Sequence, residues 1–164
     1  STCLRCHPNQ AKEGQGAKSV HASFEKGECT KCHSPHKAGL QTLMLARTPE
    51  LCFGCHKELG ARAKDEKPHA PFADRLACHQ PHPSAASRLL KEKPEVLCAG
   101  CHDLDSLGAT HAGVALKSGS CLACHDPHGS DAKGMLRDRQ HSPFSSRDCA
   151  SCRCIIISRW PSCP

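Results

Sequence analysis

The spacing of cysteine and histidine constrains this chain more than any other feature of its sequence. The 164 residues include 15 cysteines and 13 histidines, and Cys-x-x-Cys-His begins at Cys3, Cys29, Cys52, Cys98 and Cys121. Two thiols followed by an imidazole form the attachment signature of c-type haem, in which the thiols bond to the porphyrin and the histidine binds iron. Zinc knuckles and disulfide frameworks share the cysteine spacing but do not need the histidine. The motifs therefore predict covalent haem, with zinc or disulfides as minor alternatives.

The motifs belong to a repeat with a period of 46 residues. Each unit opens with an extended first motif, Cys-x-x-Cys-His-x-Pro-His, and a plain motif, Cys-x-x-Cys-His, begins sixteen residues after its last histidine. The last histidine of the first motif recurs at His36, His82 and His128, and a pre-motif histidine stands before the first motif at His21, His69, His111 and His141. Such a repeat places equivalent residues in equivalent surroundings. The third unit has no plain motif, and His141 begins a fourth copy.

The histidine count matches the number of attachment sites. Six histidines directly follow an attachment cysteine and are expected to be axial ligands: His7, His33, His56, His79, His102 and His125. The seven others occupy the repeated positions given above, so seven sites with seven further histidines predict bis-histidine coordination, which fills both axial positions of each iron. The predicted attachment cysteines are Cys3, Cys6, Cys29, Cys32, Cys52, Cys55, Cys78, Cys98, Cys101, Cys121, Cys124, Cys149 and Cys152. We expect about seven haems and no catalytic residue.

Two sites depart from the repeat. Arg75 stands where the second unit requires a cysteine, so we expect a haem held there by one thioether at Cys78, the alternative being an empty site. At Cys149 and Cys152 the residue that follows is Arg153, which has no lone pair to offer iron. We still expect a haem at this site, and the count becomes six if either site is empty.

Residues 154–164 match nothing in the repeat, and three interpretations stay open. The segment is a divergent tail, with a disulfide between Cys154 and Cys163 as one option, or it reflects an error of sequence or reading frame after Cys152. In the third interpretation the last haem is open on one side and has His141 as its ligand. Such a haem could bind a small molecule, so it is the one site that would allow catalysis.

The motif set resembles the multihaem c-type cytochromes with doubled CxxCH motifs, which are found in bacteria and archaea that respire external or periplasmic acceptors. The resemblance covers residues 3–152 and rests on CTKCHSPH, CLACHDPH, CFGCH and CAGCH. It implies small, haem-packed electron carriers outside the cytoplasm. Some members of this group polymerise into extracellular filaments whose haems form an unbroken chain.

The composition predicts a mostly irregular fold with short α-helices and no conventional hydrophobic core. Four phenylalanines, one tryptophan and no tyrosine provide little side-chain material for a core, whereas buried porphyrins would stabilise the chain by roughly 25 cal/mol per Å² of apolar surface. Pro49 and Pro94, each followed by glutamate, predict helix starts, and we expect these helices to run through Leu59 and Leu104. The His-x-Pro-His segments should be turns or extended. We expect one multihaem domain over residues 1–153, followed by the tail.

Charge and hydropathy limit the partners. The formal charge is +6, but each haem brings two propionates, so a basic surface for nucleic acid or anionic membrane is not expected. No stretch approaches the roughly 18–20 apolar residues of a membrane span. Since c-type haem is attached outside the cytoplasm, we expect a periplasmic, extracellular or cell-surface carrier whose signal peptide has been removed.

The expected function is electron transfer along closely packed haems, because attachment sites this close in sequence leave little chain to insulate one porphyrin from the next. The expected partners are redox proteins or extracellular acceptors, with self-association into filaments as a further option. The alternative is a multihaem reductase that uses an open haem at Cys149 and Cys152.

Overall fold

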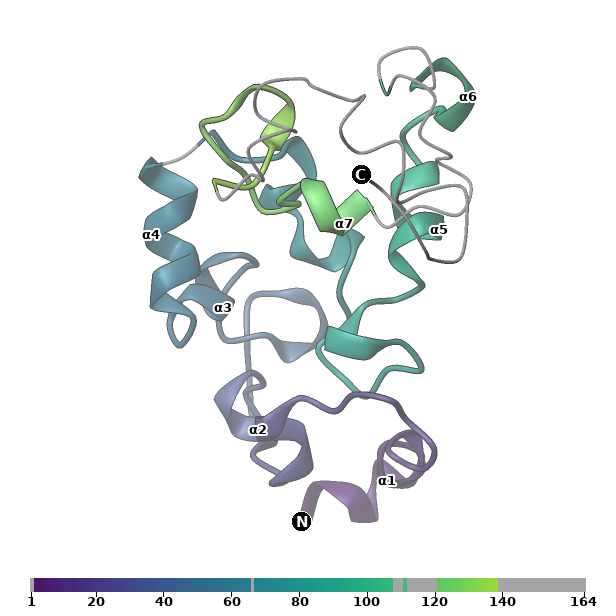
Figure 1. The fold of residues 1–164 in the computed structure, drawn as a ribbon. Coiled ribbons are helices and arrows are strands. Elements are labelled where there is room, and N and C mark those ends of the chain that lie inside the picture. The colour runs from purple at the N-terminus through teal and green to yellow at the C-terminus, as the bar shows by residue number, and fades with distance from the viewer. Residues whose placement is uncertain (1, 66, 108–110, 112–120, 139–164) are drawn as a thin grey trace.

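The computed structural model describes residues 2–65, 67–107, 111 and 121–138. Figure 1 shows short helices joined by long irregular segments, with the N-terminal residues at one end of the molecule. The α-helices are α1 (Pro8–Glu13), α2 (Ala22–Glu25), α3 (Glu50–Phe53), α4 (Lys57–Asp65), α5 (Pro94–Ala99), α6 (Leu104–Leu107) and α7 (Cys121–Cys124). The 3₁₀ helices are η1 (Thr2–Arg5), η2 (Cys29–Lys31), η3 (Gln41–Leu43), η4 (Ala70–Ala73), η5 (Arg75–Ala77), η6 (Ser87–Leu89) and η8 (Lys133–Met135). Within the described residues β-structure is limited to isolated bridges, which confirms the predicted fold class.

The helices of the plain motifs begin as predicted and end earlier. α5 has Pro94 in its first turn, and α3 has Pro49 as its N-cap. Both helices end at a glycine inside the motif, Gly54 or Gly100, a residue that disfavours helix by roughly 1 kcal/mol relative to alanine. The prediction of one helix through Leu59 or through Leu104 is therefore wrong, because the separate helices α4 and α6 follow the axial histidines.

The chain makes the same turn after each of the three first motifs. The histidine that follows the second cysteine of the motif forms an isolated bridge with the residue eleven positions later: His33 with Met44, His79 with Leu90, and His125 with Leu136. Two consecutive residues at each turn have positive φ: Thr42 (52°) and Leu43 (55°), Arg88 (58°) and Leu89 (56°), Gly134 (73°) and Met135 (55°). Residues other than glycine rarely adopt this conformation. Its recurrence therefore indicates a constraint shared by all three units.

Backbone contacts tie successive units together. Ser19, which precedes His21 of the first unit, forms an antiparallel bridge with Ser84 of the second. Pro68, which precedes His69 of the second unit, forms the equivalent bridge with Gly129 of the third. In Figure 1, α4 lies beside the loop that follows α7. The first and second units are thus each held by the first motif of the next one.

Very little of the described chain is buried. Phe72, 7% exposed, is its one buried large hydrophobic side chain, while Leu45 and Val96 are 53% and 54% exposed. The buried polar residues Ser84 and Ser130 each donate a hydroxyl hydrogen bond to a backbone carbonyl, that of Leu90 or Leu136. The fold has no conventional core, as predicted. None of the described helices is long and apolar enough to cross a bilayer.

Candidate haem sites

One turn of chain brings the two cysteines and the histidine of each complete motif together. In all five, the backbone N–H of the histidine donates to the carbonyl of the first cysteine at 2.9–3.0 Å: His7 to Cys3, His33 to Cys29, His56 to Cys52, His102 to Cys98, and His125 to Cys121. None of the described cysteines forms a disulfide. The motif geometry therefore presents two thiols and one imidazole to a common partner.

Within the described residues, five pairs of histidines face each other at a nearly constant distance. The ring centroids are 6.2 Å apart for His21 and His56, 6.3 Å for His33 and His82, 6.0 Å for His69 and His102, 6.2 Å for His79 and His128, and 6.0 Å for His111 and His125. Two imidazoles that bind one metal from opposite sides, each through a bond of about 2 Å, have centroids about 6 Å apart. The pairs therefore fit an iron ion held between the two rings.

The pairing follows two rules, one between successive repeat units and one within a unit. The histidine of a first motif faces the last histidine of the next unit's first motif, as His33 faces His82 and His79 faces His128. The histidine of a plain motif faces the pre-motif histidine of its own unit: His56 with His21, and His102 with His69. Sequence patterns alone did not predict which histidines pair, because the pairing depends on how the chain folds back within a unit and on how neighbouring units cross.

The third unit follows neither rule. It has no plain motif, and its pre-motif histidine, His111, faces His125 of its own first motif. His7 and His36, both exposed, belong to no ring pair among the described residues. His141, Cys149 and Cys152 lie outside the described residues.

Backbone carbonyls orient the histidines of the first motifs. Nδ1 lies 2.8 Å from the Thr42 carbonyl oxygen in His33, 3.0 Å from that of Arg88 in His79, and 2.7 Å from that of Gly134 in His125. Nδ1 of His111 likewise lies 2.9 Å from the Leu107 carbonyl. A proton on Nδ1 donates to each carbonyl and leaves the Nε2 lone pair for a metal. The left-handed turns therefore place a backbone carbonyl within hydrogen-bond distance of Nδ1 of each first-motif histidine.

The sequence did not predict that these backbone carbonyls accept hydrogen bonds from the histidines. They stand nine residues after the histidine of each first motif, but the residues differ (threonine, arginine and glycine) because only the backbone takes part. The constant interval of nine was the available signal.

His21 is oriented in another way. It is the N-cap of α2, and its Nδ1 accepts a long hydrogen bond, 3.3 Å, from the backbone N–H of Ser23. Burial, with a smaller contribution from nearby His56, lowers the pKa of His21. The shift favours the neutral imidazole, which is the form that binds iron. Ligation through Nε2 would put the proton on Nδ1 and remove this weak contact.

Attachment cysteines from different motifs lie beside one another. Burial, together with the neighbouring thiols of Cys121 and Cys78, raises the pKa of Cys98 to about 11. Burial and the nearby Cys52 and Cys55 likewise raise the pKa of Cys32. Porphyrins attached at these cysteines would therefore be close neighbours.

The incomplete motif of the second unit has the same ligand geometry as the complete ones. His79 and His128 are separated like the other pairs, and Cys78 is half-buried. The residues present thus offer two facing imidazoles and one thiol. Loss of the cysteine at position 75 has not changed this histidine spacing.

A contact between the first and third units fixes the loop that carries His128. Nη2 of Arg62 in α4 lies 3.1 Å from Asp126 Oδ2 and donates to the Gly129 carbonyl at 3.2 Å. Burial alone would raise the pKa of Asp126, but hydrogen bonds from the His128 backbone N–H and from Arg62 outweigh it and hold the pKa below its usual value. Asp126 is thus a carboxylate that holds the loop of His128 in place.

Two phenylalanines pack on histidines of the neighbouring pairs. Phe24, three residues after His21, lies 5.0 Å from the ring of His82. Phe72, three residues after His69, lies 5.5 Å from the ring of His128. The His-x-x-Phe pattern therefore links two histidine pairs in each of the first two units.

The fold and the paired ligands define a multihaem c-type cytochrome. A family model, the doubled CXXCH motif, matches residues 21–61, 69–106 and 111–140. These stretches make up more than half of the chain, so it belongs to the doubled CXXCH motif family. The paired motifs indicate covalent binding of c-type haem and electron transfer. None of the curated proteins matches the chain significantly.

Proposed function

We propose that this chain carries single electrons along a row of bis-histidine haems outside the cytoplasm and performs no further chemistry. The five histidine pairs, with centroids 6.0–6.3 Å apart, support the proposal most directly. When bound, c-type haem supplies reversible one-electron redox chemistry. Two histidines at one iron leave no position for a substrate, so such a site favours electron transfer over catalysis.

The side chains of the chain would bind and tune each cofactor. The cysteines would hold it covalently, and the paired histidines would bind its iron. The carbonyls of Thr42, Arg88 and Gly134 accept the Nδ1 protons, which fixes the ring orientation and raises the basicity of the ligand. The juxtaposed cysteines of neighbouring motifs support a continuous path between sites.

We propose seven haems, one of them held by the single thioether at Cys78. The seventh would be attached at Cys149 and Cys152. Intact-mass measurement of the denatured holoprotein should give the polypeptide plus seven haems. The Cys78→Ala variant should lose one haem from that total, whereas an unchanged mass would exclude attachment at Cys78.

The proposed location is the periplasm or the cell exterior, with redox proteins or extracellular acceptors as partners, and with assembly into a cytochrome filament. The resemblance to filament-forming cytochromes and the unit-to-unit ligand sharing support this assembly.

A stepwise reductive titration tests the electron-carrier proposal. The purified protein should show a mainly low-spin absorption spectrum and should accept one electron per haem counted by mass. A colourless or mainly high-spin protein would contradict the proposal. The reductase alternative requires that the reduced protein turn over nitrite repeatedly, and such turnover would replace the carrier role.

A further inference from the structure

The residue six positions after a plain-motif histidine is charged in two places, and the two charges are opposite. At this interval Glu13 follows His7, and Arg62 follows His56. Glu13 ends helix α1, which begins directly after His7, and Arg62 lies in helix α4, which begins directly after His56. After the third plain motif the position is Gly108, which lies outside the described residues. Glu13 and Arg62 therefore occupy equivalent places with opposite charge.

Each of the two residues lies near the last histidine of a first motif. Oε2 of Glu13 is 3.3 Å from Nδ1 of His82. Arg62 reaches the loop of His128, where its Nη2 is 3.1 Å from Oδ2 of Asp126. A helix that follows one plain motif thus brings a charge to a first-motif histidine of another unit.

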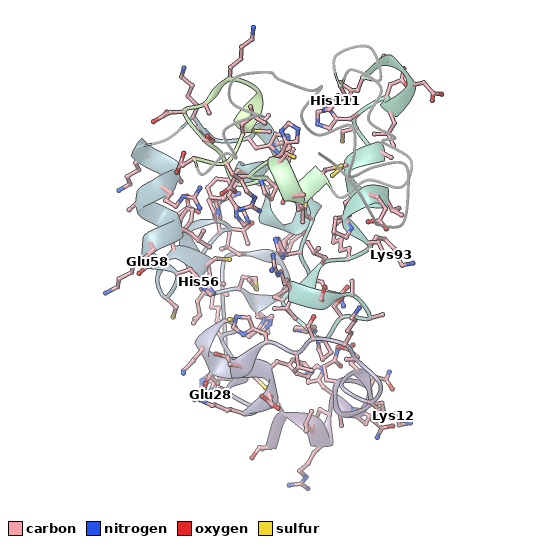
Figure 2. The ribbon with its side chains drawn as sticks, in the orientation of Figure 1. Lys12, Glu28, His56, Glu58, Lys93 and His111 are labelled. Carbon is pink, nitrogen blue, oxygen red and sulfur yellow. The ribbon has the colours of Figure 1, made fainter. Side chains whose placement is uncertain are left out.

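The carboxylate of Glu13 is held by its own helix. Nε2 of Gln10 donates to Oε1 of Glu13 at 2.8 Å, while Oε2 faces His82. The side chains of Glu13 and His82 are 37% and 40% exposed, so solvent and salt weaken their interaction without removing it. In Figure 2, Lys12 marks α1 at the lower right and Glu58 marks α4 at the left. The two helices therefore act in separate parts of the molecule.

The charge beside the two first-motif histidines differs. Oδ1 of Asp126 is 3.7 Å from Nδ1 of His128, and the guanidinium of Arg62 offsets this carboxylate. The residue of the second unit that corresponds to Asp126 is Gln80, which is neutral. At the second unit's histidine, Glu13 is the carboxylate in contact, and no cation pairs with it among the described residues. One site thus has a net negative charge, and the other has a neutral pair.

We propose that Glu13 lowers the reduction potential of the haem between His33 and His82, an inference that rests on the proposed function. In that function each ferric iron takes one electron from a redox partner and becomes ferrous. The negative charge of Glu13 stabilises the ferric form through Coulomb attraction. It also attracts the Nδ1 proton of His82, which makes Nε2 a stronger donor to iron. Glu13 is thus a positioning residue that tunes the metal through its ligand.

Arg62 tunes the equivalent haem in the opposite direction. Without its guanidinium, the carboxylate of Asp126 would stabilise ferric iron beside His128 as Glu13 does beside His82. The ion pair with Arg62 removes most of this effect. The charge at one position of the repeat therefore decides in which direction the potential of a first-motif haem of another unit moves.

A redox titration of the holoprotein, followed by electron paramagnetic resonance, tests the proposal. The rings of His33 and His82 are crossed at 64°, which gives a highly anisotropic low-spin signal. Those of His79 and His128 are nearly parallel at 18°, which gives a rhombic one. Glu13→Gln should move one anisotropic component to a higher potential and leave the rhombic components unchanged. The shift should shrink at high salt, because the interacting side chains are partly exposed.

Two further variants complete the experiment. Glu92→Gln removes the same charge from an exposed position that contacts no histidine among the described residues, so every potential should stay close to its wild-type value. Arg62→Gln should move one rhombic component to a lower potential, because Asp126 is then no longer offset. The haem content by mass and the low-spin spectrum monitor the folding of each variant.

Unchanged potentials in Glu13→Gln, or an equal upward shift in Glu92→Gln, would overturn the tuning by Glu13. A shift confined to the rhombic class would also overturn it, because Glu13 would then act on a different haem. In each of these cases, low-spin haems that still take up one electron each leave the electron-carrier proposal intact. A colourless or mainly high-spin protein would contradict the proposed function, and the tuning with it.

Discussion

At the scale of single residues, the structure distinguishes histidines that look equivalent in the sequence. His36 and His82 close identical His-x-Pro-His segments, yet His82 faces His33 and packs against Phe24, while His36 is exposed. Their environments differ because His82 meets a histidine of the first unit, whereas no ring among the described residues lies opposite His36. A substitution at the two positions should therefore have different consequences.

His82→Ala should open one haem in the dilute protein, and His36→Ala should not. Removal of His82 leaves His33 as the single ligand of its iron, so carbon monoxide gains a binding position. Titration of the reduced, dilute protein with carbon monoxide should show one additional bound molecule for His82→Ala and no change for His36→Ala. Equal stoichiometry for both variants would contradict the pairing of His33 with His82.

The ring orientations predict two classes of low-spin haem. The imidazole planes are nearly parallel for His69 and His102, at 14°, and for His79 and His128, at 18°. They are strongly crossed in the other three pairs, at 60–78°. Parallel axial imidazoles lift the degeneracy of the iron d orbitals, which gives a rhombic signal, whereas crossed rings give a highly anisotropic one.

Electron paramagnetic resonance of the oxidised protein should therefore resolve both signals. His102→Ala should diminish the rhombic class, and His33→Ala, its matched control, should diminish the anisotropic class. A spectrum with a single low-spin class would contradict the ring geometry.

At the scale of elements, the units are held together where one backbone crosses another. Gly129 has a φ of +136°, and a β-carbon there would lie 2.6 Å from the Lys67 carbonyl oxygen. The corresponding residues of the first two units are Lys37 and Pro83, so the glycine is specific to this crossing. It positions the loop of His128 against the segment that leads to His69.

Gly129→Ala should destabilise the holoprotein by about 2 kcal/mol, because the new side chain meets backbone and the residue keeps a strained conformation. Urea unfolding followed by circular dichroism measures the loss. Gly39→Ala is the matched control, since a β-carbon at Gly39 has no heavy atom within 4 Å and stability should change little. Equal midpoints for the two variants would argue against the crossing.

The sequence allowed the repeat, the attachment motifs, the His-x-Pro-His turns and the absence of a core to be predicted. It did not reveal the contacts that single units do not share. Asp126 corresponds to Gln80 and Ser34 in the other units, so comparison of the repeats could not indicate its ion pair with Arg62. The predicted continuation of helices α3 and α5 is wrong because Gly54 and Gly100, inside the plain motifs, disfavour helix.

At the scale of the whole molecule, side chains bury very little apolar surface within the described residues. Of the described large hydrophobic residues, Phe72 alone is buried, and a chain with so small an apolar core gains too little from burial to offset its conformational entropy. We therefore expect the stability of the fold to come from the attached porphyrins.

Polypeptide produced without haem attachment should accordingly lack a cooperative unfolding transition. Circular dichroism should show little helix, and heating should give a gradual change, whereas the holoprotein should unfold in one sharp step. A Cys29→Ala/Cys32→Ala variant, which keeps the other sites, should lie between the two, because it loses the covalent attachment of one haem. If the haem-free chain unfolded as sharply as the holoprotein, side-chain packing would be the main source of stability.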